Sequence, residues 1–438
     1  MHAAQALLLA ALRGAPRRYR LPPLPTGIEA ARAAGVECAL AFAIEAARAA
    51  AGHGTPAPDA VRELFISALA SFIREAMAPQ GGDPSFQALV LQARDAQVRE
   101  FVQLAPRAAA DRRAVGSMTD AIAHPGKLRQ LPPGPGRAAL EQLHALAASG
   151  AWAQLRDAAR TAGHDAIACS PALQRLLRRD ALLRDDAVQR YLALCEQRGP
   201  AAGSRAAAAR GRSAARAGDD AERATVEAFQ ALVVLLQERV PGAYRVLRSL
   251  RPPPGFPGEP GKAKDEWDAA IACGPAPGSA DILLLAEVKA SPAAASSDFS
   301  RLHRGLQRLA QADPARAYDF ACADGAARIG GASLRALQPA ARAVPEHVIY
   351  CCTAPPERQP QLLAAASKAV LGAEPASLAY AQQLALGAAA REQDLLPVWD
   401  ALLHAPRLRA TLHQDATARL VRAAMLHPAD LVASLAAL

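Results

Sequence analysis

The spacing of hydrophobic residues divides the chain into helical and mixed regions. Residues 1–123 and 138–197 carry apolar residues at i, i+3 and i+4 between Pro and Gly breaks, which is typical of amphipathic helices. Residues 356–438 are rich in Ala and Leu and also read as helical. Residues 218–355 instead contain short, nearly continuous apolar runs bounded by turn residues, which predicts strands.

The mixed region predicts the order helix, three strands, helix, strand. The expected elements are a helix over 220–240, strands over 243–251, 266–272 and 281–290, a helix over 298–312 and a strand over 346–352. This order favours an α+β or α/β core of the type αβββαβ with a mixed sheet. All-α regions would flank that core on both sides.

Two segments have the composition of linkers. Residues 124–137 are rich in Pro and Gly, and residues 198–217 are rich in Arg, Ala and Gly. The second segment has no acid before Asp219, so it suits either a solvated linker or a strip of chain along a phosphate backbone. We expect a linker, with a domain of residues 218–355 after it.

The composition of the chain limits the classes of binding partner and the cellular compartment that we expect for the protein. The net charge of +9 and the pI of about 9.5 favour a polyanionic partner such as DNA, although a GC-rich genome would also enrich Arg. The seven cysteines show no zinc-ligand spacing, so we expect reduced thiols and a cytoplasmic protein. No apolar run reaches the roughly 20 residues of a membrane span, so no membrane partner is expected.

Charged residues end the most apolar strand. The run Ile282–Ala286 leads directly into Glu287, Val288 and Lys289. Because side chains alternate along a strand, Glu287 and Lys289 project from one face. Asp268 is the only acid inside the apolar run of the preceding strand, and a hairpin would place it beside Glu287. The pattern predicts either an ion pair with a neighbouring strand or a site of two carboxylates and one ammonium.

A divalent metal would suit such a site. Two carboxylates supply the hard oxygen donors that Mg²⁺ prefers, and Mg²⁺ keeps room for waters and a substrate phosphate. The ion would lower the pKa of a water and offset charge on the transition state. Lys289 would orient that water or help to deprotonate it.

Neighbouring acids compete for these roles. Asp281 lies six residues before Glu287, about 20 Å along an extended strand, which is too far to share an ion. Glu266 would share a face with Asp268 and Asp265 would not, but both belong to the polar entrance of the strand. Asp268 is therefore the favoured partner of Glu287.

The preceding helix offers a third acid. One helical stripe contains Glu222, Val226, Phe229, Val233, Leu236 and Val240. Glu222 is the one charge on that stripe and would face the sheet, with Glu227 as second choice. A surface acid favoured by the helix dipole explains Glu222 equally well.

This pattern resembles the PD-(D/E)XK nuclease superfamily over about residues 218–353. The residues that carry the resemblance are Asp268, Glu287, Val288 and Lys289, with Glu222 on the preceding helix. The resemblance implies cleavage of DNA phosphodiester bonds with Mg²⁺ or Mn²⁺ held by Asp268, Glu287 and the Val288 carbonyl. It also implies that Lys289 assists the attacking water. Glu222 would match the helix acid that some members use.

The helix after the charged strand is basic. Its candidates for nucleic-acid contact are Arg301, Arg304, Gln307 and Arg308, and its three arginines share a face. A solvated basic face is the equal alternative. Together these features predict a repair or defence nuclease whose helical regions bind DNA, a protein partner or a second copy. The rival hypothesis is a catalytically inert DNA-binding or assembly scaffold that keeps the nuclease fold.

Overall fold

The computed structural model describes residues 3–199, 204–275, 278–340 and 343–438, which form two compact units. The first unit consists of residues 1–69, 203–370 and 396–438 and contains the sheet. The second consists of residues 70–202 and 371–395. The predicted domain 218–355 lies within the first unit.

The first unit is built on a mixed five-stranded sheet of order β1-β2-β3-β6-β7. Its strands are β1 (Tyr244–Leu250), β2 (Trp267–Cys273), β3 (Asp281–Lys289), β6 (Val348–Cys352) and β7 (Met425–Leu426). The first three strands pair antiparallel, and β6 and β7 continue the sheet parallel to β3. The α+β class and the mixed sheet are as the sequence predicts.

Strand β3 lies at the centre because it is apolar on both faces. Residues Ile282 to Ala286 are all buried, as expected for a strand that is covered on both sides. Cys273 pairs with Asp281 at one end of the β2–β3 ladder and Ala269 with Ala286 at the other. The register shifts by one residue between Ile271 and Ala272, which is a β-bulge.

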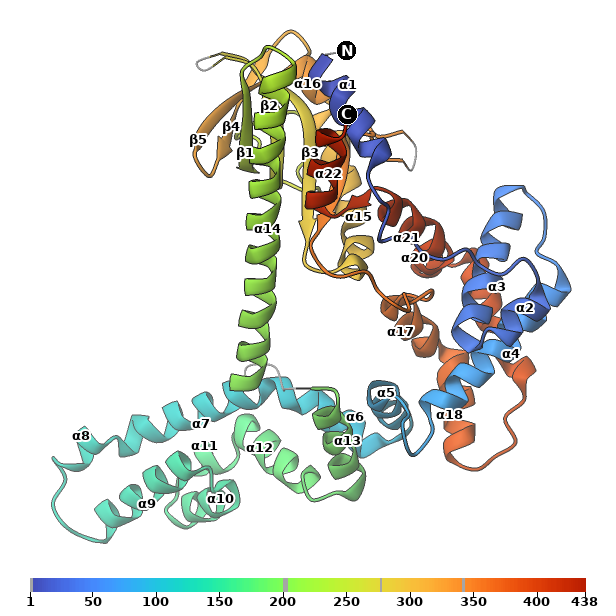
Figure 1. Cartoon of the computed structure of the whole chain (residues 1–438). Coiled ribbons are helices and arrows are strands. Elements are labelled where there is room, and N and C mark those ends of the chain that lie inside the picture. The colour runs from blue at the N-terminus through green and yellow to red at the C-terminus, as the bar shows by residue number, and fades with distance from the viewer. Residues whose placement is uncertain (1–2, 200–203, 276–277, 341–342) are drawn as a thin grey trace. The chain divides into compact units, whose positions relative to one another are not determined.

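Helices cover both faces of this sheet (Figure 1). One face packs against α1 (Ala3–Gly14), α14 (Arg205–Arg239) and α22 (Pro428–Ala436). The other packs against α15 (Pro292–Leu309), α21 (Gln414–Ala423) and the two-stranded sheet of β4 (Ala317–Cys322) and β5 (Gly325–Gly330). The chain thus brings its first and last helices to the same face of the sheet.

Helix α14 corrects the expected linker. Residues 205–217 of the predicted linker 198–217 are helical, and the Ser204 hydroxyl caps the helix by accepting a 3.1 Å hydrogen bond from Ala207 N. Ala and Arg have high helix propensity, and the helix is anchored to the sheet by buried residues from Ala221 onward. The glycines at 211 and 218 lie inside it.

Two other expectations are also corrected. The predicted linker 124–137 contains α8 (Pro125–Leu128), and α9 begins at Pro135. The C-terminal region is not all-α, because Met425 and Leu426 form β7 against β6. A two-residue strand has no detectable period, so the apolar pattern of this region predicts helices alone.

The remaining helices complete each unit. Those of the first unit are α2 (Ile28–Ala33), α3 (Val36–Gly52), α16 (Gly331–Arg335), α19 (Leu396–His404) and α20 (Arg409–Leu412). Helices α4 (Asp59–Ala76) and α17 (Ala365–Ala373) contain two of the points where the chain passes between units. Those of the second unit are α5 (Pro84–Arg94), α6 (Ala96–Leu104), α7 (Ala108–Ala123), α8, α9 (Pro135–Ser149), α10 (Trp152–Thr161), α11 (Asp165–Ala168), α12 (Pro171–Leu182), α13 (Asp186–Gln197) and α18 (Pro375–Ala385). Short 3-10 helices occupy Ala105–Arg107, Glu392–Leu395 and Pro406–Leu408.

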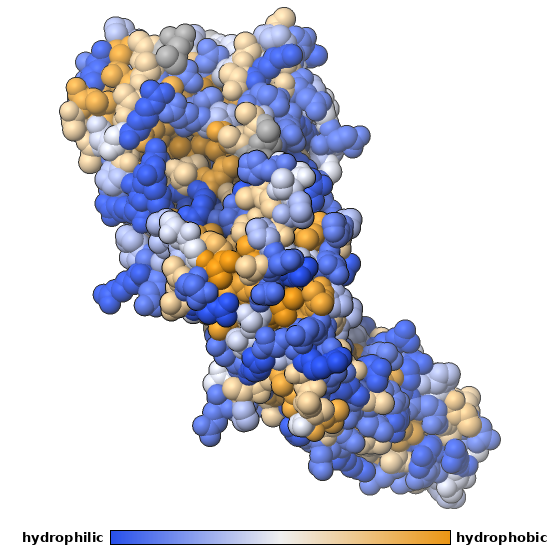
Figure 2. All heavy atoms as spheres, turned by 90° about the vertical axis from the view of Figure 1, so that its right-hand side faces the viewer, coloured by the Kyte–Doolittle hydropathy of each residue, from blue (hydrophilic) through white to orange (hydrophobic). Residues whose placement is uncertain are grey.

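The surface is mixed in character. Figure 2 shows one face of the molecule, on which apolar residues form small areas bordered by hydrophilic ones. Within the described residues, no helix has both the length and the hydropathy needed to cross a membrane.

Candidate active site

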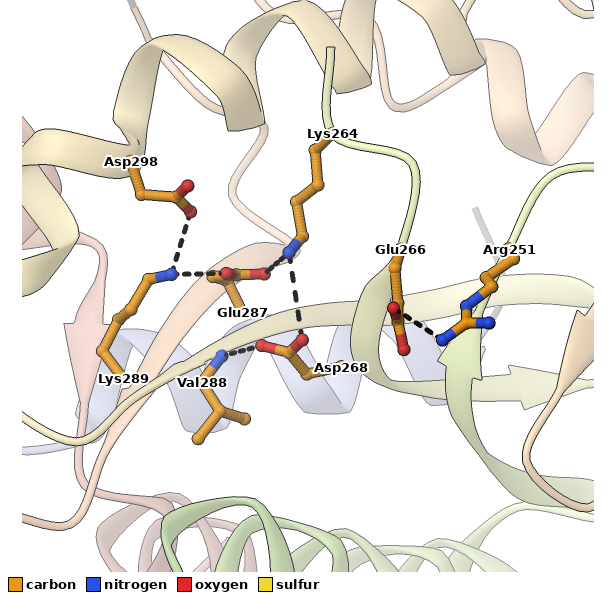
Figure 3. A network of polar contacts seen from close by, with 8 residues as sticks. All are labelled: Arg251, Lys264, Glu266, Asp268, Glu287, Val288, Lys289 and Asp298. Atoms are coloured by element: carbon orange, nitrogen blue, oxygen red, sulfur yellow. Dashed lines mark hydrogen bonds and ion pairs between the residues drawn. The ribbon is translucent and has the colours of Figure 1, made fainter. Parts of the chain in front are cut away.

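Asp268 and Glu287 meet at the ends of neighbouring strands. The antiparallel register pairs Ala269 of β2 with Ala286 of β3, so the next two residues outward are Asp268 and Glu287. The Asp268 carboxylate turns toward β3 and accepts a 2.6 Å hydrogen bond from Val288 N (Figure 3). The side-by-side placement expected from a hairpin is therefore present.

Lys289 lies on the same face as Glu287, as strand alternation predicts. Its ammonium donates a 2.6 Å hydrogen bond to Glu287 Oε1 and lies 2.9 Å from Asp298 Oδ2. Asp298 belongs to α15, whose buried stripe of Ala295, Phe299 and Leu302 packs on the sheet. The helix therefore carries a carboxylate to the end of β3, where it holds the lysine side chain from the far side.

Lys264 places a second ammonium between the two strand carboxylates. Its Nζ is 2.6 Å from Glu287 Oε2 and 3.9 Å from Asp268 Oδ1 (Figure 3). The segment before β2 reaches this position by resting on α15, where Lys264 N donates a 3.1 Å hydrogen bond to Arg301 O. Gly305 permits the approach, because a Cβ there would lie 2.9 Å from Lys264 Cβ and 3.0 Å from Trp267 Cζ2.

Burial and close charges shift the pKa values of the side chains in this cluster. Glu287 is 2% exposed, and burial followed by repulsion from Asp268 raises its pKa to about 8, while both lysines oppose the rise. The pKa of Lys289 is raised despite burial, because the carboxylates of Glu287 and Asp298 favour its charged form. The pKa of Asp298 is lowered despite burial, because Lys289 stabilises the carboxylate. Two ammonium groups thus face three carboxylates in a site that largely excludes water.

The other predicted acids have separate outcomes. Glu222 on α14 is half-buried, and burial followed by the negative charges of Asp268 and Glu266 raises its pKa, so it lies within the field of the site. Glu227 is exposed. Glu266 instead pairs with Arg251 at 2.9 Å (Figure 3). Asp281 begins β3 at the opposite end from Glu287, as expected.

Sequence analysis missed Lys264, Asp298 and Tyr350. Tyr350 is opposite Glu287 in the β3–β6 ladder, and its buried hydroxyl has no hydrogen-bond partner among the described residues. Burial followed by the charges of Asp298 and Glu287 raises its pKa. The clustering of three of the chain's five lysines at 262–289 was a signal for Lys264. Asp298 is the acid on the apolar stripe of α15, the same signal that identified Glu222.

The donor chemistry of the carboxylate pair suits a divalent metal. Asp268 and Glu287 are hard oxygen donors, and the cluster carries one more negative than positive group. The Lys264 ammonium lies against the same two carboxylates that would hold such an ion. In the part of the chain that the structure describes, no three His, Cys, Asp or Glu side chains are grouped to hold a metal. A metal here would depend on two carboxylates and the backbone at Val288.

The basic helix α15 carries the residues predicted to contact nucleic acid. Arg304, Gln307 and Arg308 line a hollow next to α15, whereas Arg301 is exposed outside it. Arg304 donates to Lys262 O through Nε at 3.3 Å and Nη2 at 3.1 Å. Three of the four predicted contact residues therefore belong to one surface feature.

Comparison of the chain with models of protein families, with curated proteins and with solved structures gives no match. Conclusions about function therefore rest on the residues and their geometry.

Proposed function

We propose that the sheet-containing unit is a metal-dependent nuclease of the PD-(D/E)XK type that hydrolyses DNA phosphodiester bonds in repair or defence. The observation that carries the proposal is the cluster at the ends of β2 and β3. There, Asp268 and Glu287 lie side by side and Lys289 is held against Glu287 at 2.6 Å. A structural ion pair needs only two of these groups, whereas hydrolysis uses all three.

Each residue has a distinct part in the reaction. Asp268 and Glu287 would hold Mg²⁺ or Mn²⁺ with the Val288 carbonyl, and the ion would supply Lewis-acid stabilisation of the phosphate. Because the pKa of Lys289 is raised, its amine stays protonated at neutral pH. Lys289 therefore orients the attacking water and stabilises developing negative charge as a donor, and does not act as a base. Asp298 fixes the direction of that ammonium.

Lys264 favours a second candidate function. Its ammonium already neutralises the carboxylate pair, so the cluster is satisfied as an ion-pair network without a metal. A DNA-binding or assembly scaffold that keeps the nuclease fold would have this arrangement. Such a scaffold would bind DNA in a salt-sensitive way, without need of Mg²⁺ and without need of Lys289.

A cleavage assay separates the two functions. Plasmid, linear duplex and single-stranded DNA are incubated with Mg²⁺, Mn²⁺ or EDTA and the wild type, Lys289→Ala or Asp268→Asn. We expect metal-dependent cutting that falls about 10²–10³-fold in both variants. Glu266→Gln is the matched control, since Glu266 pairs with Arg251 outside the cluster and should leave cutting intact. DNA binding without cutting by the wild type would refute the nuclease and favour the scaffold.

A further inference from the structure

A hollow of about 540 Å³ lies between α15 and the segment that leads to Lys264. Its polar lining consists of Glu259, Lys262, Arg304, Gln307, Arg308 and Gln311. The segment is anchored by Phe256, which packs edge-on against Tyr318 at 4.9 Å between ring centroids. This contact anchors the Pro/Gly-rich stretch before β2, and Ala263 of the hollow directly precedes Lys264 of the carboxylate cluster.

The cations of this hollow lack the acidic partners that two arginines at β1 have. Arg248 pairs with Asp324 and Arg251 with Glu266. By contrast, among the described residues no carboxylate forms an ion pair with Lys262, Arg304 or Arg308. Among the described residues that line the hollow, positive charge is therefore in excess and Glu259 is the one acid.

Arg308 is the least exposed of these cations. Its guanidinium lies over the Phe256 ring at 5.7 Å from the centroid, and its buried Nε has no hydrogen-bond partner within the residues that the structure describes. A buried guanidinium nitrogen without a partner costs free energy, which an oxyanion would offset by accepting its hydrogen bond. Arg304 is likewise held in place by Lys262 O, with donors left over for a ligand.

We propose that this hollow binds a phosphate of a nucleic-acid strand and so positions that strand beside the carboxylate cluster. The inference rests on the proposed function for its choice of polyanion. Guanidinium forks and amide N–H groups are the donors that proteins direct at phosphate oxygens. The volume exceeds what one inorganic phosphate needs and suits a nucleotide unit. Lys262 and Lys264 are two residues apart, at most about 7 Å of chain, so one strand can touch both places.

DNA binding in EDTA tests the hollow without any cleavage. Fluorescence anisotropy of a labelled 12-nucleotide single strand and its duplex is measured with the wild type, Arg304→Gln and Arg308→Gln. Each variant should weaken binding about tenfold and lower the slope of log K against log salt by roughly 0.7–0.9. The charge-matched control is Arg335→Gln, since Arg335 is exposed and does not line the hollow. Circular dichroism confirms that each variant is folded, and the exposed Arg304 provides the test if Arg308→Gln misfolds.

Each outcome decides for or against the hollow. Weakening in the two hollow variants with little change in Arg335→Gln supports it. Equal, small losses in all three variants would overturn it, because net charge alone would then explain binding. If Arg308→Gln loses the binding of inorganic phosphate that the wild type shows but binds DNA unchanged, the hollow is a small-anion site. The proposal that it holds a nucleic-acid strand then fails. If the hollow variants lose DNA binding but the wild type never cuts DNA, the hollow is supported and the nuclease is rejected. If Arg308→Gln binds and cuts DNA normally, the hollow is rejected and the nuclease is supported.

Discussion

Replacing Lys264 with Met should make the protein's stability depend on a divalent metal. The substitution keeps a long unbranched side chain but removes the ammonium that lies 2.6 Å from Glu287 and 3.9 Å from Asp268. The two carboxylates are then left facing each other with only Lys289 as a cation on Glu287. A divalent ion would be free to take the place that the ammonium had.

The magnitude follows from the distances and the burial. With Glu287 ionised, above its pKa of about 8, and at an effective dielectric constant of about 20, the lost attraction is about 6 kcal/mol to Glu287 and about 4 kcal/mol to Asp268 before desolvation is counted. Lys264 is 11% exposed, so water screens little of it. Breaking a buried pair costs about 3–5 kcal/mol, and the remaining contact with Lys289 favours the lower end. A loss of about 3 kcal/mol lowers Tm by about 6–12 °C for a unit of this size.

Thermal unfolding in EDTA measures the stability that Lys264→Met loses, and thermal unfolding in Mg²⁺ measures how much of it the metal restores. An ion present at 100 times its Kd stabilises the folded state by about 2.7 kcal/mol, which nearly restores the Tm of the variant. The wild type should respond much less, because the metal must first displace Lys264. Trp267 gives a second readout, since its ring centroid is 5.9 Å from the Lys264 ammonium and its emission should change when that group moves. Lys262→Met is the control, because Lys262 is exposed and should leave Tm unchanged.

Two results would refute this reasoning. A Tm for Lys264→Met in EDTA within about 1 °C of the wild type would show that the ammonium contributes little to the cluster. Equal stabilisation of both proteins by Mg²⁺ would show that the metal binds somewhere other than between Asp268 and Glu287.

Three further expectations concern other parts of the same unit. Between pH 4.5 and about 8 the folded protein binds more protons than the unfolded chain because the pKa of Glu287 is raised to about 8. Stability should therefore fall as pH rises through this window, and urea titrations of Glu287→Gln should lose that slope. Asp298→Asn should lower the pKa of Lys289, moving the alkaline limit of cleavage to lower pH while DNA binding in EDTA stays unchanged; an unmoved pH profile would contradict it. Phe229→Ala in the buried stripe of α14 should cost about 3–5 kcal/mol in urea unfolding, and a loss below 1 kcal/mol would mean that α14 is not held by that stripe.

The candidate site was predictable where it depended on strand geometry. Alternation along β3 places Glu287 and Lys289 on one face, and hairpin register brings Asp268 beside Glu287. Both follow from a period of two residues and a short turn. Lys264 has no such period, because the segment before β2 is irregular and takes its place by resting on α15. Its contact with Glu287 depends on tertiary packing at Gly305, which no local pattern reports.

The fold was predictable to a similar degree. The helix after β3 begins at Pro292, six residues earlier than expected, so Asp298 falls in its second turn and not at its start. The hairpin β4–β5 was missed, although Asp324-Gly325 between short apolar runs is a hairpin signal and Gly325 has φ +118°. The N-terminal half of α14 was missed because its Gly and Arg content resembles a linker, while Ala propensity keeps it helical.

The placement of α1 and α22 on one face of the sheet has a consequence for synthesis on the ribosome. Leu8 and Leu12 near the start of the chain share a core with Leu431 and Leu435 near its end, against Leu283 of β3. Strand β3 is made about 136 residues before β7, which is roughly 7–30 s of translation. During that interval the face that α1, α14 and α22 cover still lacks α22. Apolar residues of this face therefore stay partly uncovered until α22 is made, and the predicted domain 218–355, which lacks α1, α22 and β7, should be less stable when expressed by itself.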